Sequence, residues 1–351
     1  MKKLRVAVIG CGSIAKAAHL PAYQKAEGCE IAYLCDVLVE RAEEAVAEYG
    51  GSAVTDYREL LEKEDIDVVS VCTPNNVHAR ITIDFLKAGK HVLCEKPAAR
   101  TYSEALEMQK AHHETGRILN IGVCNRFNSS VVRIKQLIDS GELGDIYHVY
   151  LSFRAHRSIP GLGGAFTTKD IAGGGALIDW GVHFLDIVMY CCGDPAPRTV
   201  TGQTFSKLGC DIAGYTYTGM WAGPPVMDGV YDVDDSVTAL IRTEGPVLTL
   251  HGAWAQNIGK EEMYIDFMGE TGGVRLDYGA GFTQYTAKDG ALLEIKPSFT
   301  MENMYEEEIK NFLDCVQTGK PSSASIDKAV LSSQILQAIY DSSESKCEIA
   351  F

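Results

Sequence analysis

The sequence lacks two features that would direct a protein to a membrane or to nucleic acid. No stretch reaches the about 18 uninterrupted apolar residues of a membrane span, because even Ala176–Cys192 contains Asp179, His183 and Asp186. Positive charge is scarce: 32 Lys and Arg stand against 47 Asp and Glu, a formal net charge of −15. Such a field repels polyanions. We therefore expect no membrane and no nucleic-acid partner.

Paired cysteine spacing is also missing. The 11 cysteines include no C-x-x-C pair, and most lie within apolar runs such as Val92–Cys94. Zinc and redox motifs usually show paired spacing, so we expect reduced, buried thiols and a cytoplasmic location. The N-terminal apolar run resembles a secretion signal only in part, since Gly10, Gly12 and Lys16 interrupt it. We predict a β-strand there.

The length of 351 residues fits two domains of roughly 100–200 residues each. Up to residue 124, short β-branched runs alternate with helical patterns, which predicts a parallel sheet covered by helices on both faces. The expected strands are Leu4–Ile9, Glu30–Cys35, Asp67–Cys72, His91–Cys94 and Ile118–Val123. The expected helices are Ser13–Ala26, Val39–Glu48, Tyr57–Lys63, Asn76–Ala88 and Ser103–Glu114.

The second half has a different rhythm, with longer alternating stretches separated by Gly-rich turns, which indicates an α+β domain with a mostly antiparallel sheet. We expect domains 1–124 and 125–351. The expected strands are Ile146–Arg154, Val237–Thr243, Val247–Trp254, Met263–Met268 and Gly273–Leu276. The expected helices are Ser130–Asp139, Ala176–Cys192, Glu306–Thr318 and Ile326–Ser343.

A glycine loop follows the first predicted strand. Residues 10–15 fit G-x-G-x-x-A at the start of a helix, the context in which this motif indicates dinucleotide binding. Gly10 permits a tight turn, and Gly12 lets the backbone approach a pyrophosphate. Ser13 and Ile14 begin the helix, whose N-terminus supplies amide donors to an anion.

Asp36 ends the second predicted strand, where a carboxylate can accept hydrogen bonds from both ribose hydroxyls of an adenosine. It would repel a 2′-phosphate, and the nearest following cation, Arg41, belongs to the next helix. NAD is therefore favoured over NADP. The alternative is that the glycines only form a turn and Asp36 only caps the following helix.

Three further motifs lie at Thr73–His78, at Glu95-Lys96-Pro97 and at Gly174–Asp186. With the glycine loop they resemble the glucose-fructose oxidoreductase/inositol dehydrogenase/rhizopine-catabolism (Gfo/Idh/MocA) family over nearly the whole chain. The resemblance implies a Rossmann domain, a C-terminal domain with a large open-faced antiparallel sheet, and NAD(P)-dependent oxidation or reduction of a sugar or cyclitol hydroxyl. It also implies a homo-oligomer, a dimer or tetramer, formed through that sheet.

The resemblance further implies the site residues. Lys96, Asp179 and His183 correspond to a catalytic trio that also touches the substrate. Thr73, Pro74, Asn75, His78, Glu95, Lys96 and Asn125 lie along the nicotinamide side of the cofactor.

The residues themselves support these roles. Asp179 and His183 are i and i+4 on a predicted helix, and a carboxylate beside an imidazole fixes its orientation and favours its protonated form. That arrangement suits a general base for alcohol oxidation. Lys96, at the carboxyl end of a parallel strand, can stabilise negative charge on the same oxygen. The alternatives are a helix-surface pair and a solvated lysine.

We predict no metal site. Asp179 and His183 have no third ligand at metal spacing, and His112-His113-Glu114 lacks the H-E-x-x-H order, so it is expected to be exposed helix surface.

The Gly-rich segment 154–172 precedes the helix that carries Asp179 and His183. It is expected either to gate the substrate or to be an interface or structural loop. Arg154, His156, Arg157, Thr167 and Lys169 could hydrogen-bond sugar hydroxyls, and Trp180 could stack on a sugar ring. The aromatic stretch 215–231 fits either an apolar aglycone or a subunit contact. Asp232–Asp235 is expected to cap the start of a strand.

The sequence therefore predicts an NAD-dependent dehydrogenase that oxidises a secondary ring hydroxyl of a sugar, glycoside or cyclitol to a ketone. Two rivals remain at this point: a redox-assisted glycosidase that retains its NAD, and a non-catalytic regulator that senses NAD or sugar, because fold alone does not fix activity.

Overall fold

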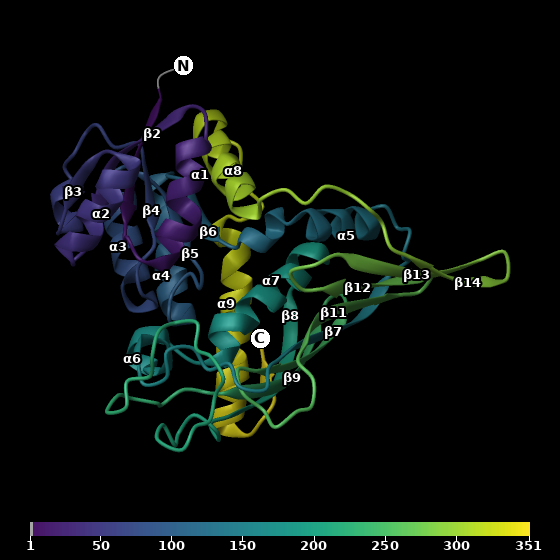
Figure 1. Cartoon of the computed structure of the whole chain (residues 1–351). Coiled ribbons are helices and arrows are strands. Elements are labelled where there is room, and N and C mark those ends of the chain that lie inside the picture. Colours follow the sequence, from purple (N-terminus) through teal and green to yellow (C-terminus); the bar gives the residue numbers. More distant parts are fainter. Residues whose placement is uncertain (1–2) are drawn as a thin grey trace. The chain divides into compact units, whose positions relative to one another are not determined.

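The computed structural model describes residues 3–351 and divides the chain into two compact units (Figure 1). Of the described residues, the first unit comprises 3–127 and 302–330, and the second comprises 128–301 and 331–351. Each unit has its own sheet and its own core, and each is described by itself below.

The first unit is built on a six-stranded sheet in the order β3-β2-β1-β4-β5-β6, with every neighbouring pair parallel. This is the doubly wound Rossmann order, in which ligands bind at the carboxyl edge where the strand order reverses. The strands are β1 (Leu4–Ile9), β2 (Cys29–Cys35), β3 (Ser52–Val54), β4 (Val68–Val71), β5 (His91–Glu95) and β6 (Leu119–Gly122).

The helices of this unit confirm most of the expected pattern. They are η1 (Ala15–His19), α1 (Leu20–Lys25), α2 (Val39–Tyr49), η2 (Tyr57–Leu60), α3 (Asn75–Lys87), α4 (Tyr102–Thr115), η3 (Cys124–Phe127) and α8 (Met304–Thr318). The short edge strand β3 was not predicted, and η2 is a single 3₁₀ turn. The helix after the glycine loop contains a π-helical turn, η1, just before Pro21, which has no N–H to donate to an α-helical ladder.

The first unit differs from the expected division at residue 124, because residues 302–330 return to it. Ile309, Phe312 and Leu313 of α8 are buried in one core cluster with residues of β1, β2 and β4. A second core cluster lies on the other side of the sheet, and Ala324 and Ile326 belong to it. Sequence periodicity predicts that these helices are amphipathic but does not say which sheet their apolar faces cover.

The second unit is built on a nine-stranded sheet in the order β14-β13-β12-β11-β7-β10-β9-β8-β15. Only β7 and β10 pair in parallel among these described strands; the other neighbours are antiparallel. The strands are β7 (Ile146–Arg154), β8 (Pro197–Phe205), β9 (Ser236–Thr243), β10 (Val247–Ala253), β11 (Glu262–Gly269), β12 (Gly272–Asp277), β13 (Phe282–Lys288), β14 (Ala291–Ile295) and β15 (Ile349–Ala350). The β13–β14 hairpin projects beyond the rest of this sheet (Figure 1).

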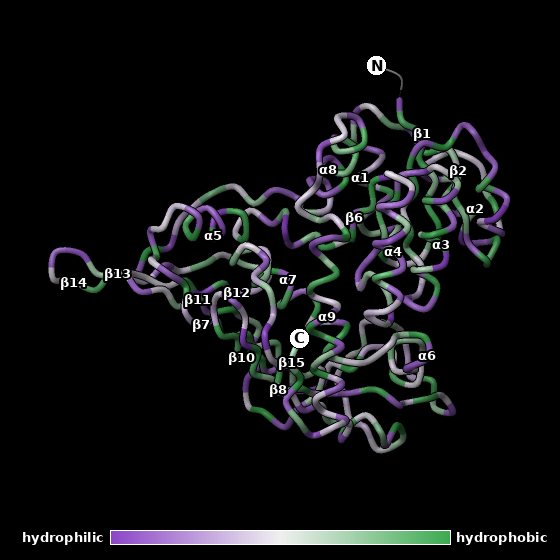
Figure 2. The backbone as a smooth tube through the Cα atoms, turned by 180° about the vertical axis from the view of Figure 1, so that it is seen from behind, coloured by the Kyte–Doolittle hydropathy of each residue, from purple (hydrophilic) through white to green (hydrophobic). Residues whose placement is uncertain are grey.

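In the second unit, hydrophobic and hydrophilic parts of the chain are intermixed (Figure 2). From Val149 to Arg154 the residues of β7 alternate between the two kinds, as they do in a sheet with one buried face. Val149, Leu151 and Phe153 are buried, and Phe153 packs on Phe184 of α7 with ring centroids 5.1 Å apart. The helices of this unit are α5 (Ser129–Asp139), η4 (Ala165–Thr167), α6 (Lys169–Ala172), η5 (Leu177–Gly181) and α7 (Val182–Cys191), and α9 (Ile326–Ser345) begins in the first unit and ends in the second.

One helical stretch, Lys169–Cys191, is long and apolar enough by composition to cross a membrane. Within the structure, however, 78% of its most apolar window is buried. Its apolar residues, among them Leu185, Ile187 and Val188, belong to the core of the second unit. Burial of this kind is what a core helix shows.

Candidate active site

The glycine loop has the geometry that its residues predict. Gly10 has a φ of +93°, and a Cβ there would lie 2.4 Å from the carbonyl oxygen of Cys72 in the neighbouring strand end, so only glycine fits the turn. A Cβ on Gly12 would meet nothing within 4 Å. Ser13 is exposed and Ile14 half-buried at the start of the helix. The space over Gly12 is what close approach of a pyrophosphate requires.

Asp36 lies at the end of β2 and faces the glycine loop. Its Oδ2 accepts a hydrogen bond from the amide of Cys11 at 2.9 Å, and its Oδ1 accepts one from the amide of Leu38 at 2.9 Å. The carboxylate is only 8% exposed. Asp36 therefore fixes the turn after β2 and presents an oriented carboxylate beside the glycine loop. Its bond to the amide of Leu38, which precedes α2, is not a side-chain cap of that helix.

The Thr73-Pro74-Asn75 turn follows β4, Glu95-Lys96-Pro97 ends β5, and Asn125 follows β6. Because these strands are parallel neighbours, the three segments share one edge of the sheet with the glycine loop. The Thr73 hydroxyl is buried and has no hydrogen-bond partner among the described residues. A buried, unsatisfied hydroxyl is costly unless a ligand binds it. With the space over Gly12, it indicates that this edge fits a dinucleotide.

His78 has a structural role that the sequence did not reveal. The ring is fully buried; Nδ1 lies 2.9 Å from the Pro97 carbonyl oxygen and Nε2 lies 2.7 Å from the Thr73 carbonyl oxygen. Carbonyl oxygens only accept, so both ring nitrogens must donate and the ring is an imidazolium. Burial lowers the pKa of His78, but the adjacent Cys94 thiol and the two carbonyls outweigh it and raise the pKa to about 9. His78 thus ties two turns of the cofactor edge together.

Glu95 is held by a buried hydrogen-bond chain. His19 Nε2 lies 2.8 Å from Glu95 Oε1, His19 Nδ1 lies 3.2 Å from the Ser70 hydroxyl, and the Tyr23 hydroxyl lies 2.7 Å from the same Ser70 oxygen. The Lys96 amide donates to Glu95 Oε2 at 3.1 Å. Burial raises the pKa of Glu95, but the hydrogen bond from His19 and the charge of Lys96 outweigh it and lower the pKa below its usual value.

His19, Ser70 and Tyr23 were not predicted as site residues from the sequence. The available signal was a polar residue inside an apolar segment: Ser70 interrupts the valines of β4, and His19 sits between Ala18 and Leu20. Such residues need buried hydrogen-bond partners. The identity of those partners could not be predicted, because it depends on the order of the strands in the sheet.

In the second unit, Asp179 and His183 lie on one continuous helical run, Asp179 in the π-helical turn η5 and His183 in the first turn of α7. Asp179 is 8% exposed and His183 is half-buried. The indole Nε1 of the fully buried Trp254 donates to Asp179 Oδ2 at 3.3 Å. Trp254 was predicted only as the end of a strand. A buried indole N–H needs an acceptor, and Asp179 supplies it.

The start of this helix is clamped by Asp234. Asp234 accepts hydrogen bonds from the amides of Gly175 at 2.8 Å and Leu177 at 2.9 Å, and from the Tyr340 hydroxyl at 2.7 Å. A Cβ on Gly175 would lie 1.9 Å from the Asp234 carbonyl oxygen, which explains the glycine there. Burial raises the pKa of Asp234, although these hydrogen bonds oppose the shift.

The expectation that Asp232–Asp235 caps one strand therefore has to be corrected. Asp232 accepts from the Lys169 amide, Asp234 caps the helix that carries Asp179, and Asp235 accepts from the amides of Lys207, Leu208 and Gly209. The acidic cluster satisfies backbone donors of three separate segments.

The predicted substrate residues are placed differently. Arg154 forms an ion pair with Glu262 at the end of β7. Side chains alternate along a strand, and Phe153 faces α7, so Arg154 points to the opposite face of the sheet from that helix. His156 is exposed, with Nδ1 3.0 Å from the Gln256 carbonyl oxygen. Thr167 is fully buried and donates to the Val230 carbonyl, a structural role rather than a substrate contact.

The Gly-rich segment and the aromatic stretch pack on each other. A separate core cluster joins Ile159 and Leu162 of the first with Tyr215 of the second, and it includes Trp254. Trp180 is half-buried against the same cluster. Trp221 packs edge-on against Phe166 and remains 59% exposed. The Gly-rich segment and the aromatic stretch therefore form one packed layer against Trp254, which donates to Asp179.

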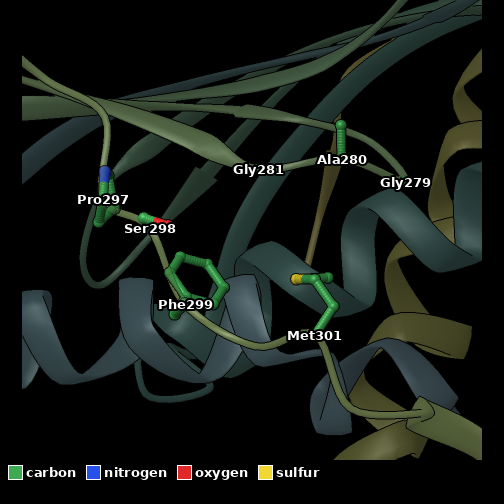
Figure 3. A pocket seen from close by; sticks show the side chains of 7 residues that line it. All are labelled: Gly279, Ala280, Gly281, Pro297, Ser298, Phe299 and Met301. Carbon is green, nitrogen blue, oxygen red and sulfur yellow. The ribbon is translucent and has the colours of Figure 1, made fainter.

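A shallow hollow of about 350 Å³ also lies in the second unit (Figure 3). Phe299 and Met301 line it opposite the β12–β13 turn, and none of its described lining residues belongs to the predicted site. The lining residues are Gly279, Ala280, Gly281, Pro297, Ser298, Phe299 and Met301.

Comparison with known proteins gives matches over both halves of the chain. Residues 4–123 match the model described as an oxidoreductase family with an NAD-binding Rossmann fold, and residues 131–275 match the GFO/IDH/MocA C-terminal domain.

Three individual proteins illustrate the similarity. D-glucoside 3-dehydrogenase of Escherichia coli (strain K12) is 33% identical over 346 residues, which cover 97% of this chain and 95% of the relative. Levoglucosan dehydrogenase of Pseudarthrobacter phenanthrenivorans is 32% identical over 260 residues, 69% of this chain and 65% of the relative. The crystal structure of GenD2, from gentamicin A biosynthesis, in complex with NAD is 25% identical, with a TM-score of 0.80 and coverage of 100% of this chain and 97% of that one.

Proposed function

We propose that this chain, which belongs to the Gfo/Idh/MocA family of NAD-binding oxidoreductases, oxidises a secondary ring hydroxyl of a sugar, glycoside or cyclitol to a ketone. The observation that carries the proposal is the similarity to a D-glucoside 3-dehydrogenase along 97% of the chain. It favours a glucoside among these substrates. The intact set of Lys96, Asp179 and His183 supports an enzyme rather than a regulator, which would need no such set.

The first unit would hold the cofactor. NAD, when bound, accepts the hydride that leaves the substrate carbon. Gly12 would leave room for the pyrophosphate, and the Asp36 carboxylate, held by the Cys11 amide, would accept from the ribose hydroxyls. The Thr73 hydroxyl would be available to the nicotinamide half. The Asp36 carboxylate, already oriented by two backbone amides, would repel a 2′-phosphate, which favours NAD over NADP.

His183 would act as the general base. Oxidation of an alcohol requires loss of the hydroxyl proton, and the imidazole of His183 takes it. Asp179, one helical turn earlier, orients the ring and stabilises the imidazolium that forms. The hydrogen bond from Trp254 and the Asp234 clamp at the helix start hold Asp179 in place.

Lys96 would donate a hydrogen bond to the same substrate oxygen and stabilise the negative charge that develops on it. The backbone of Lys96 is held in place by Glu95, because the Lys96 amide donates to the Glu95 carboxylate, which in turn accepts from His19. Asn75, Pro74, His78 and Asn125 are proposed to support the nicotinamide side from the same edge of the sheet. His156 is proposed to act outside the reacting centre, at the edge of the substrate region. Arg154, which pairs with Glu262 on the other face of the sheet, is given no substrate role.

We also propose a homo-oligomer formed through the outer face of the large sheet, and a cytoplasmic location. The inner face packs on α5 and α7, whereas the outer face carries the contacting rings of Tyr150, His251 and Tyr264. Light scattering should give a mass that is a multiple of 38.2 kDa. Tyr264→Glu should lower it to one chain; an unchanged multiple would place the interface elsewhere.

The test of the activity is NADH formation by the purified protein, with NAD and a panel of alkyl and aryl glucosides, free hexoses and inositols. His183→Ala should reduce kcat by about 10²–10⁴-fold, and Lys96→Ala by about 10²–10³-fold, while both variants still bind NAD. Lys87→Ala, at an exposed lysine near the end of α3, is the matched control and should retain full activity.

Full activity in either catalytic variant would remove the role assigned to that residue. No net NADH, together with tightly held NAD and release of an aglycone, would indicate the redox-assisted glycosidase instead. NAD binding without turnover of any substrate would indicate the regulator.

A further inference from the structure

A second cluster of ligating side chains lies in the first unit, outside the residues used by the proposed reaction. His112 and His113 belong to the last turn of α4, and Asp327 belongs to the first turn of α9. One ligand atom from each lies within 4.8 Å of the others. The sequence predicts only exposed helix surface at His112-His113; Asp327 joins them through the fold.

The carboxylate of Asp327 is already oriented. Its Oδ1 accepts from His113 Nε2 at 2.7 Å and from the Gln109 amide at 2.8 Å. Its Oδ2 lies 3.9 Å from His112 Nε2. Burial alone would raise the pKa of Asp327, but these neighbours outweigh it and lower the pKa, which keeps the group an anion.

The hydrogen bond at the other side of His112 fixes its tautomer. Nδ1 lies 2.6 Å from the Arg117 carbonyl oxygen, which can only accept, so Nδ1 carries the proton. In the neutral ring the Nε2 lone pair then faces a carboxylate oxygen, and two acceptors oppose each other. A cation between them removes the conflict, either a proton on Nε2 or a metal ion. A backbone carbonyl on the remote ring nitrogen is also the usual partner of a metal-ligating histidine.

We propose that His112, His113 and Asp327 bind a divalent transition-metal ion that connects the end of α4 to the start of α9. Two imidazoles and one carboxylate suit Zn²⁺, Ni²⁺, Co²⁺ or Cu²⁺ and not Mg²⁺ or Ca²⁺, which need oxygen ligands. The three residues leave the remaining coordination positions to water. The C-terminal end of α4 also carries partial negative charge, which favours a cation there.

The geometry needs only small side-chain movements. Ligands about 2.0–2.2 Å from a metal lie roughly 3–3.5 Å from one another. The contact between His113 and Asp327 must therefore open slightly from 2.7 Å, and the separation between His112 and Asp327 must close slightly from 3.9 Å. His113 is 57% exposed and Asp327 43% exposed, so both side chains can adjust.

Binding has two physical consequences. A metal ion needs an unprotonated ring nitrogen, so the proton on His113 Nε2 must move to Nδ1 or leave to solvent. Protons and the metal then compete for the imidazoles, so affinity must fall as the pH falls. A ligand that binds only the folded chain also stabilises it, so the melting temperature must rise with metal concentration. Both effects are independent of catalysis.

The experiment is a calorimetric titration of the full-length, untagged, EDTA-treated protein with Zn²⁺, Ni²⁺ or Mg²⁺. The exposed thiols Cys210 and Cys347 are competing ligands, so every variant is made in a Cys210→Ser/Cys347→Ser background. We expect one ion per chain with a micromolar dissociation constant for Zn²⁺ and Ni²⁺ and no measurable binding of Mg²⁺. His113→Ala and Asp327→Asn should each weaken binding at least tenfold and remove the rise in melting temperature.

His148→Ala, a histidine on β7 outside the cluster, and Asp314→Asn, at an exposed carboxylate of α8, are the matched controls and should bind as the parent does. Asp327→Asn can still accept from Gln109, which guards against a trivial loss of folding. Equal affinity in parent and cluster variants, loss of affinity in the controls, or no binding at all would overturn the proposal.

Discussion

His19 Nε2 lies 2.8 Å from Glu95 Oε1, and both side chains are buried, so the helix that follows the phosphate loop is joined to the strand end that carries Lys96. Breaking a buried pair of this kind by removing one partner leaves an uncompensated group. The pair therefore links two parts of the cofactor edge that are far apart in the sequence.

The first prediction concerns this pair. His19→Ala should lower the free energy of unfolding by about 3 kcal/mol at neutral pH, whereas His19→Gln, whose amide can donate to Glu95, should recover part of it. The folded-state pKa of Glu95 is depressed from 4.5, so its contribution is present above pH 4.5 and is lost as pH falls through the depressed value. Urea unfolding at a series of acidic pH values measures this loss of stability. An identical pH dependence of the unfolding free energy in wild type and His19→Ala would contradict the role given to the His19–Glu95 pair.

A second prediction separates the two glycines of the phosphate loop. Gly10→Ala should destabilise the fold by about 2 kcal/mol or more, because the residue has a positive φ and no room for a Cβ. Gly12→Ala should leave stability nearly unchanged and weaken NAD binding about tenfold or more. Gly259→Ala, where a Cβ also meets nothing within 4 Å, is the control and should affect neither. Unfolding curves measure the stability of each variant, and NAD titrations measure its affinity. Tight NAD binding by Gly12→Ala would contradict the proposal that the pyrophosphate binds at this loop.

Asp36 gives a third prediction, on cofactor choice. Asp36→Ser should weaken NAD about tenfold and leave NADP affinity equal or improved, because the substitution removes both the ribose acceptor and the charge that repels a 2′-phosphate. Dissociation constants for the two nucleotides, measured side by side, test this. A ratio unchanged from the wild type would mean that another residue reads the ribose.

The imidazolium of His78 gives a fourth prediction. Its folded-state pKa of about 9 lies above its ordinary value of 6.5, so its stabilising contribution is complete below pH 6.5 and is lost as pH rises through about 9. The loss should amount to roughly 3 kcal/mol. Unfolding free energies measured on both sides of this interval should fall in the wild type and stay nearly level in His78→Gln. Parallel curves would show that another group titrates there.

Trp254 gives the fifth prediction. Trp254→Phe keeps an aromatic ring in the buried layer and removes the N–H that donates to Asp179. We expect kcat to fall about tenfold with little change in KM, because the lost hydrogen bond orients Asp179, the proposed partner of the base His183, and does not bind substrate. A rise in KM at constant kcat would instead make Trp254 part of the substrate pocket.

Local pattern predicted the elements near the cofactor edge well, because each strand there is a short apolar run followed by a turn residue with a physical reason. β1 has the predicted bounds Leu4–Ile9. In the second unit, β7 also has its predicted bounds, Ile146–Arg154. What local pattern could not supply is pairing between distant segments. The contacts of His19 with Glu95, of Trp254 with Asp179 and of Asp327 with His113 span long stretches of chain, and nothing in their spacing marks the partners.

Arg154 illustrates the opposite error. It lies at the predicted strand end beside the predicted loop, and its charge suggests a sugar contact, but the parity of β7 turns it to the other face of the sheet, where Glu262 neutralises it. The weaker strands β8, β13 and β14 were missed because their exposed residues dilute the alternation.

The return of residues 302–330 to the first unit bears on how the chain can be made. While the ribosome is still adding the second unit, strands β1 to β6 lack Ile309, Phe312 and Leu313, which fill one side of their core. A nascent chain that has reached residue 127 must therefore leave apolar surface of this core exposed to solvent until nearly the whole protein has been synthesised. The N-terminal half is first in order of translation, yet its folding is completed only when the C-terminal helices emerge.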